Sequence, residues 1–278
     1  MKFPLGYIGM GQMGGPMTKR LASLGWQVRG YDVVPERSAV SSPMEAAKGA
    51  DVVLLNLPTN DAVEDALAKL IPVLRPPQLV VDFSTIPVEA CRRHAASLLK
   101  GTGCRWVDAP VSGGPPAVQQ GTLTVMAGGE RQDLERLAPL MKDIAQRCTH
   151  MGPVGAGLAA KMINQLIVGV GQAMLGEAVA LCENAGIDAA RMPECLAGGY
   201  ADSNVLKAYW PRMVERDFAP RGYVRQLLKD LEMVRAWADG LHSETPMLQT
   251  ALEAYRKLKK QGHSELDTSA VLKLYLDD

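Results

Sequence analysis

The glycine-rich turn at residues 9–14 constrains the fold more than any other feature of the sequence. Residues 5–8 have the pattern of a short buried strand, and the GxGxxG run that follows leads into a helical pattern at residues 16–24. Residues 26–32 have the pattern of a second strand, which ends in Asp32. A GxGxxG between strand and helix, with an acidic residue about twenty positions further on, is typical of a dinucleotide-binding unit.

The three glycines have separate tasks in such a unit. Gly9 permits the tight turn, Gly11 lets the backbone approach a pyrophosphate, and Gly14 lets the helix pack closely on the strand. Free N–H groups at the helix N-terminus then face the phosphates. The residues of this turn that we expect to bind the cofactor are Gly9, Met10, Gly11, Gln12, Met13 and Gly14.

Asp32 bears on which nucleotide binds. A carboxylate at this position can accept hydrogen bonds from the ribose hydroxyls and would repel a 2′-phosphate. This favours NAD over NADP as the cofactor, although the nearby Arg37 leaves NADP possible.

Further strand-like runs follow at regular spacing and alternate with helical segments. They lie at residues 51–57, 79–83, 106–111 and 122–127. This alternation predicts a mostly parallel sheet with helices on both faces. Ligands of such sheets bind beyond the carboxyl ends of the strands. Three small polar clusters are expected on that rim: Leu57-Pro58-Thr59, Ser84-Thr85 and Ser112-Gly113-Gly114.

The connection after the second strand is short. Ser42, Pro43 and Glu45 have the pattern of a helix start, with Ser42 as N-cap and Glu45 at the third helical position. Residues 33–41 are then too few for a crossover helix. We therefore predict no regular helix there.

The second half of the chain has a different pattern. Strand signals disappear after Val154, and residues 155–184 are apolar almost all round, which predicts a long helix covered on every side. Further helices are expected at residues 189–196, 205–215, 222–239 and 247–261. The prediction is an α/β protein with a Rossmann-type doubly wound domain at residues 1–152 and an all-α domain at residues 153–278. The long apolar helix also predicts a homodimer or homotetramer.

Composition excludes several classes of protein. Thirty basic residues balance thirty acidic ones, so charge gives no reason to expect a nucleic acid or membrane partner. The five cysteines form no CxxC pair and are expected to be buried free thiols of a reducing compartment. The four histidines lack metal-ligand spacing, so no metal site is expected. Without a leader or an apolar run long enough to span a bilayer, the protein is expected to be cytoplasmic.

Lys161 is a charged residue in an apolar segment that has no other charge until Glu177. In a helix, Lys161, Asn164 and Gln165 share one face. A partly buried ammonium can have its pKa lowered toward neutrality, which makes it a usable acid and base. Taken alone, a lysine that extends to solvent from a packed helix would be the better interpretation.

Four sequence blocks together resemble the β-hydroxyacid dehydrogenase family, which includes 3-hydroxyisobutyrate dehydrogenase and tartronate semialdehyde (2-hydroxy-3-oxopropionate) reductase. The resemblance covers essentially the whole chain. In the family's order, the blocks are residues 9–17 (GMGQMGGPM), 108–114 (DAPVSGG), 155–164 (GAGLAAKMIN) and 229–231 (KDL). The resemblance implies an oxidoreductase that transfers a hydride between a nicotinamide cofactor and a small β-hydroxyacid or its semialdehyde.

The same resemblance implies roles for single residues. Lys161 is the expected catalytic acid/base, because an alcohol that loses a hydride must also lose a proton. Asn164 is expected to hold the substrate and the lysine in register. The substrate carboxylate is expected to bind at Ser112, Gly113 and Gly114. The remaining positions expected to contact the cofactor are Leu57, Pro58, Thr85 and Lys229, of which Lys229 also reaches the substrate.

Two other functions are compatible with this scaffold. One is imine reduction, and the other is a non-catalytic nucleotide-binding module. Relatives with either role usually lack the lysine, so Lys161 favours a dehydrogenase. The sequence leaves the β-hydroxyacid open, although residues 198–204 (GGYADSN) resemble the tartronate semialdehyde reductases slightly more.

Overall fold

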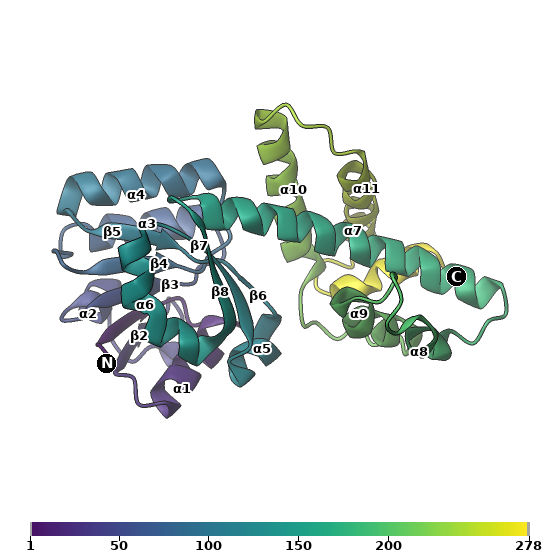
Figure 1. Ribbon diagram of the computed structural model, residues 1–278, viewed down its shortest axis with the longest axis horizontal. Helices are drawn as coiled ribbons and strands as arrows, with labels where there is room; N and C mark the ends of the chain where they lie inside the picture. The colour runs from purple at the N-terminus through teal and green to yellow at the C-terminus, as the bar shows by residue number, and fades with distance from the viewer. Residues whose placement is uncertain (1, 277–278) are drawn as a thin grey trace. The chain divides into compact units, whose positions relative to one another are not determined.

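The computed structural model describes residues 2–276, and the chain divides into two compact units (Figure 1). The boundary lies between Lys161 and Met162, within helix α7 (Ala156–Asn184). The division at residue 152 that the sequence suggests falls just before this helix. The first turn and a half of α7 therefore belongs to the sheet-containing unit, and the rest of it belongs to the helical unit.

The first unit contains, within the described residues, an eight-stranded and mostly parallel sheet. The parallel strands, in the spatial order β2-β1-β3-β4-β5, are β1 (Leu5–Ile8), β2 (Val28–Tyr31), β3 (Val52–Leu55), β4 (Leu79–Asp82) and β5 (Arg105–Asp108). Beyond β5 lie the antiparallel β7 (Leu123–Gly128), the short β6 (Val111–Ser112) and β8 (Ala145–Gly152). The predicted Rossmann-type α/β fold is confirmed.

Two details of the sheet differ from the prediction. The run expected at residues 106–111 divides into β5 and β6, because Pro110 has no N–H to continue the ladder. Strand β8 was not expected, since its sequence AQRCTHMG is mostly polar and its side chains are largely exposed. Pairing with β7, rather than local composition, makes this segment a strand.

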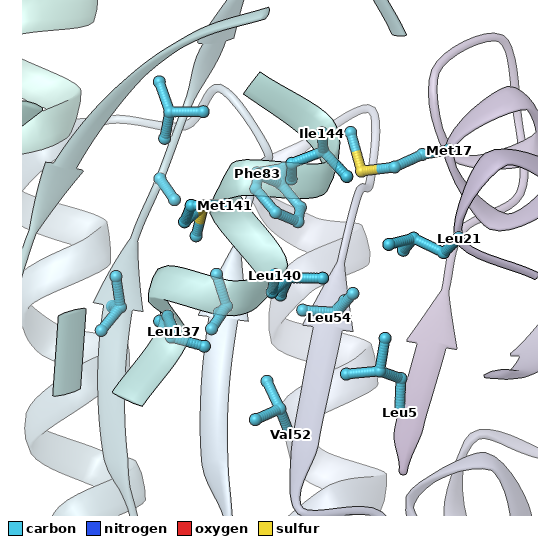
Figure 2. Close-up of a cluster of buried hydrophobic side chains, with 14 of the residues drawn as sticks. Leu5, Met17, Leu21, Val52, Leu54, Phe83, Leu137, Leu140, Met141 and Ile144 are labelled. Atoms are coloured by element: carbon cyan, nitrogen blue, oxygen red, sulfur yellow. The ribbon is translucent and has the colours of Figure 1, made fainter. Parts of the chain in front are cut away.

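Helices cover both faces of the sheet. One face carries α1 (Gly14–Ser23), α5 (Gly114–Gln120) and α6 (Arg131–Ile144), and the other carries α2 (Pro43–Ala47), α3 (Asn60–Leu70) and α4 (Val88–Thr102). Figure 2 shows part of the core on the first face, where Leu137, Leu140 and Ile144 of α6 lie among side chains of the strands and of α1. This packing fixes the strand ends on which the candidate site is built.

The connection after β2 has the predicted form. In place of a crossover helix there is one 3-10 turn, Pro35–Arg37. Helix α2 follows, with Ser42 as its N-cap: the Oγ atom accepts a hydrogen bond from Glu45 N at 3.2 Å. The Glu45 carboxylate accepts one from Ser41 N at 2.9 Å. The prediction that residues 33–41 form no regular helix is confirmed.

The second unit is helical, as predicted. After α7 come α8 (Met192–Leu196), α9 (Asn204–Val214), α10 (Val224–Gly240) and α11 (Pro246–Lys260), with 3-10 segments at Ala189–Arg191 and Thr268–Leu274. Small residues let these elements approach α7. A Cβ atom on Gly169 would lie 2.6 Å from Leu231 Cδ2, and one on Gly176 would lie 3.1 Å from Val271 Cγ1.

Helix α7 and two cysteines require corrections. The prediction that no apolar run is long enough to span a bilayer is wrong: within residues 2–276, α7 has 29 residues and qualifies by length and composition. Half of its most apolar window is buried against the rest of the chain. Among the cysteines, Cys148 and Cys195 are exposed rather than buried, although all five are free thiols.

Candidate active site

The glycine turn at residues 9–14, called the cradle below, has open space beside its backbone at Gly11, where a pyrophosphate could approach. A Cβ atom on Gly9 would overlap the carbonyl oxygen of Asn56, and one on Gly14 would overlap that of Gly9, so both positions require glycine for packing. A Cβ atom on Gly11, by contrast, would meet no atom within 4 Å. The N-cap of α1 has no side-chain hydrogen bond and its first turn has no acidic residue. The positive dipole end of α1 at this turn therefore favours an anion, which fits a dinucleotide.

Asp32 joins the end of β2 to this cradle. The residue is only 9% exposed, and its carboxylate accepts hydrogen bonds from Met10 N at 2.6 Å and from Val34 N at 2.9 Å. Ser38 Oγ also donates to the backbone carbonyl of Asp32 at 2.7 Å. Because each carboxylate oxygen has two lone pairs, Asp32 can hold the turn and still accept a ribose hydroxyl. The sequence motif gave no indication of this bracing role.

The loops after β3 and β4 are tied together on the same rim. Leu57 N donates to Ser84 Oγ at 2.8 Å, and Ser84 N donates to Asp82 Oδ1 at 2.9 Å. These bonds place the loop of Leu57 and Pro58 beside the loop that contains Thr85, which is half-buried. The structure therefore brings together three of the positions expected to contact the cofactor.

Lys161 lies beside the turn expected to bind the substrate carboxylate. Its side chain is buried, with 7% exposure, and Nζ donates a hydrogen bond to Val111 O at 2.8 Å. Val111 directly precedes Ser112, and Gly113 and Gly114 follow with φ of +128° and +67°. Glycine adopts these positive φ values readily, whereas other residues do so at a cost. The backbone of this turn is therefore shaped by its two glycines.

A second group of predicted residues is connected within the helical unit. Asn164 Nδ2 donates to Gln165 Oε1 at 2.8 Å, and Gln165 Nε2 donates to Asp230 Oδ2 at 2.7 Å. Lys229 Nζ forms an ion pair with Asp230 Oδ1 at 3.2 Å. These bonds orient the amide of Asn164 and the ammonium of Lys229. The sequence assigned no role to Gln165 or Asp230, although Gln165 was expected on the Lys161 face and Asp230 belongs to the block at residues 229–231.

Two buried carboxyl groups lie side by side at the ends of β4 and β5. Asp82 and Asp108 are partners in the strand register, and both have 0% exposure. Burial raises the pKa of Asp82 to about 7, against hydrogen bonds from Ser84 that lower it, and the Asp108 charge raises it further. Burial also raises the pKa of Asp108, while backbone N–H groups of Gly155 and Leu158 oppose the shift. Sequence reasoning missed both acids, although each ends an apolar strand.

Comparison with known proteins agrees with this architecture along the chain. Residues 4–152 match the family described as the NAD binding domain of 6-phosphogluconate dehydrogenase. Residues 155–275 match the one described as NAD-binding of NADP-dependent 3-hydroxyisobutyrate dehydrogenase. The two matches meet immediately before α7.

Individual relatives are similar over nearly their whole length. An NAD-dependent L-serine dehydrogenase of Pseudomonas aeruginosa is 36% identical, over 98% of this chain and 97% of that protein. A 2-hydroxy-3-oxopropionate reductase of Escherichia coli is 31% identical over 96% of both. The structure of Mycobacterium tuberculosis 3-hydroxyisobutyrate dehydrogenase with L-serine has a TM-score of 0.91, at 30% identity and full coverage of both chains.

The cradle, the strand rim and the matched families define a nicotinamide-dependent oxidoreductase that acts on a CH–OH group. More particularly, the chain belongs to the β-hydroxyacid dehydrogenase family.

Proposed function

We propose that this enzyme interconverts a small β-hydroxyacid and its semialdehyde, with Lys161 as the general acid/base. The observation that carries the proposal is the buried Lys161 Nζ, held 2.8 Å from Val111 O at the start of the Ser112-Gly113-Gly114 turn. A buried charged group at the carboxyl end of a parallel sheet needs a reason, and acid/base chemistry supplies one.

Proton transfer at Lys161 is the step that the protein itself performs. Hydride transfer would be supplied by a nicotinamide cofactor bound at the rim of the sheet. In oxidation the Lys161 amine accepts the hydroxyl proton, and in reduction the ammonium returns it to the developing alkoxide. The hydrogen bond to Val111 O fixes the direction from which Nζ approaches the substrate oxygen.

The turn after β6 is the proposed carboxylate site. The Ser112 hydroxyl and the backbone N–H groups of Gly113 and Gly114 would bind the carboxylate oxygens. The acids in the relatives' names share a carboxylate and an oxygen on the β-carbon: L-serine, 3-hydroxyisobutyrate and 2-hydroxy-3-oxopropionate. L-Serine joins the two acids suggested by the sequence because of the similarity to the serine dehydrogenase.

The family resemblance supports two further substrate contacts, Asn164 and Lys229. The Asn164 amide is oriented by Gln165, and its carbonyl oxygen would accept a hydrogen bond from the substrate hydroxyl. Lys229, held by Asp230, would contact both the cofactor and the substrate. For the cofactor we propose NAD, from the position of Asp32 at the end of β2, with NADP as the second possibility.

Helix α7 is the proposed subunit interface. It exposes four large apolar side chains: Ile163, Ile167, Met174 and Leu181. Helical apolar surface of this kind is usually covered by another subunit. We infer a homodimer or homotetramer that works in the cytoplasm on a small carboxylate, with neither nucleic acid nor membrane as partner.

A substrate screen and one variant test the function. L-Serine and 3-hydroxyisobutyrate should be assayed with NAD and with NADP, and 2-hydroxy-3-oxopropionate, which is already a semialdehyde, with NADH and with NADPH. At least one of the three should turn over. Lys161→Ala should lower kcat by about 10²- to 10⁴-fold while cofactor still binds in a fluorescence titration. Residual kcat within a few-fold of wild type would remove Lys161 from the mechanism.

A further inference from the structure

Asp108 is a buried carboxylate at the start of the helix that carries Lys161. Its Oδ1 atom accepts a hydrogen bond from Gly155 N at 2.7 Å, and Oδ2 accepts one from Leu158 N at 2.8 Å. Leu158 lies three residues before Lys161, which is less than one helical turn. The carboxylate therefore holds the first turn of α7 to the end of β5.

A second contact joins the same two segments. Lys161 Nζ donates to Val111 O, and Val111 lies three residues after Asp108. Residues 108–111 thus bind α7 at two points, at its first turn and at the tip of its lysine. Because backbone hydrogen bonds make a helix stiff along its axis, the position of the first turn sets the position of Lys161.

Two glycines enclose the Asp108 carboxylate. A Cβ atom on Gly128 would lie 2.5 Å from Asp108 Oδ1, and one on Gly157 would lie 2.9 Å from Asp108 Oδ2 and would overlap Met126 O. Neither position has room for a side chain. Backbone from β7 and from α7 therefore packs directly against the carboxylate, and α7 cannot shift without breaking these contacts.

The neighbouring titratable groups leave Asp108 as the favoured place for negative charge. Burial raises the pKa of Asp82 to about 7 and raises the pKa of the Cys91 thiol. Both side chains are therefore mostly protonated, and neutral, at pH values below 7. Burial also raises the pKa of Asp108, but this shift is opposed because each of its oxygens accepts an N–H group at the N-terminus of a helix. The partial positive charge of the helix end stabilises an anion there.

We propose that Asp108 is a positioning residue: it fixes the first turn of α7 so that Lys161 Nζ is held at Val111 O, beside Ser112. The proposal rests on the general acid/base role of Lys161 proposed above. A looser first turn would move the ammonium and slow proton transfer. The cofactor cradle at residues 9–14 would keep its structure, since the hydrogen bonds that Asp108 accepts come from Gly155 and Leu158 rather than from this turn.

The first test is Asp108→Asn, which preserves shape but replaces one acceptor oxygen with an amide nitrogen that cannot accept an N–H. We expect kcat to fall about 10- to 100-fold, as misplacement of a catalytic group by about 1 Å does. The NAD dissociation constant should stay within about twofold of wild type, because the cradle is untouched. The solvent deuterium isotope effect on kcat should rise as proton transfer becomes slower.

The matched control is Asp133→Asn. Asp133 is also a buried acid of the first unit, but it pairs with Arg105 at the start of β5, at 2.6 Å. This variant should lose stability and keep the kcat and solvent isotope effect of wild type. A merely structural effect of Asp108→Asn would give that same result.

Gly157→Ala tests the proposal without changing a charge. The added methyl group would push the first turn of α7 away from Asp108, and the kinetic changes should match those of Asp108→Asn. Gly171→Ala on the same helix is its control, because a Cβ atom there would meet only Val205 Cγ1, at 3.6 Å. If Asp108→Asn does not fold, Gly157→Ala decides the question.

Two results overturn the proposal. One is wild-type kcat and isotope effect in the folded Asp108→Asn or Gly157→Ala enzyme. The other is failure of both variants to fold, which would assign Asp108 to stability alone. Lys161→Ala in the same assay separates this inference from the proposed function, because near-normal activity there refutes the lysine's role whatever the Asp108 variants do.

Discussion

The carboxylate of Asp32 accepts a hydrogen bond from Met10 N at 2.6 Å, so the residue proposed to bind the ribose also holds the turn proposed to bind the pyrophosphate. Cofactor selectivity and cofactor affinity should therefore be coupled in this enzyme. If the carboxylate only discriminated between NAD and NADP, it could be replaced without disturbing the turn at residues 9–14.

We predict that wild type prefers NAD and that Asp32→Ser weakens binding of both nucleotides. Loss of hydrogen bonds to a charged acceptor costs about 1.5–3 kcal/mol each, which corresponds to about 10- to 100-fold in affinity. Dissociation constants for NAD and NADP give the answer, with Glu36→Gln on the exposed 3-10 turn as control. Improved NADP binding with unchanged NAD binding would show that Asp32 does not brace the turn. A wild-type preference for NADP would show that Arg37 outweighs the carboxylate.

The Gln165 amide should act on substrate binding through Asn164. Gln165→Leu removes the acceptor of Asn164 and the donor to Asp230, so the Asn164 side chain loses its fixed orientation. We expect the KM for the acid to rise several-fold, with loss of about 1–3 kcal/mol of stability from the buried Asp230. Gln172→Leu is the control, since Gln172 is buried on the same helix and bonds to Tyr255. Equal effects of the two variants on KM would contradict the prediction.

Helix α7 should carry the subunit contact. Wild type at micromolar concentration should be at least a dimer by light scattering. Ile167→Glu and Leu181→Glu, at positions that are 63% and 71% exposed, should shift it toward monomer because a charge would be desolvated in the interface. Leu241→Glu, at an exposed position just after α10, should leave the assembly unchanged. A monomeric wild type would refute the proposed interface.

Asp82 should make stability fall with rising pH. Its pKa is raised from 3.8 to about 7 in the folded state, so the native protein binds a proton there that the unfolded chain has already released. The contribution of Asp82 to the free energy of unfolding is complete below about pH 4 and is lost as the pH rises through about 7.

The Asp82→Asn variant removes this titration. Between about pH 5 and about pH 8, its free energy of unfolding relative to wild type should rise by about 2–3 kcal/mol. Urea unfolding of both proteins at the two pH values measures this difference. A difference that does not change with pH would mean that Asp82 ionises in the folded protein as it does in the unfolded chain. Asp82 interacts electrostatically with Tyr7, Cys91 and Asp108. All three residues are present in wild type and in the Asp82→Asn variant.

The parts of the fold that depend on neighbours in sequence were predictable. The glycine turn, the Ser42 cap and the short connection after β2 follow from steric limits and hydrogen bonds that act over a few residues. The amphipathic or apolar pattern of each later segment likewise indicated a helix. Strand β8 was missed for the converse reason, since only its pairing with β7 makes it a strand.

The sequence by itself determined which chemical groups the enzyme has: a glycine turn at residues 9–14, an acid at Asp32, a lysine in an apolar helix and a glycine turn after Ser112. The tertiary structure alone decided what holds them. Asp108 meets Gly155 and Leu158 across 47 and 50 residues of sequence, and Gln165 meets Asp230 across 65. No local pattern encodes such contacts, because they exist only once the chain has packed strand ends against helix starts. Backbone donors at Asp108 and an amide donor at Asp230 then offset the desolvation of these two carboxylates.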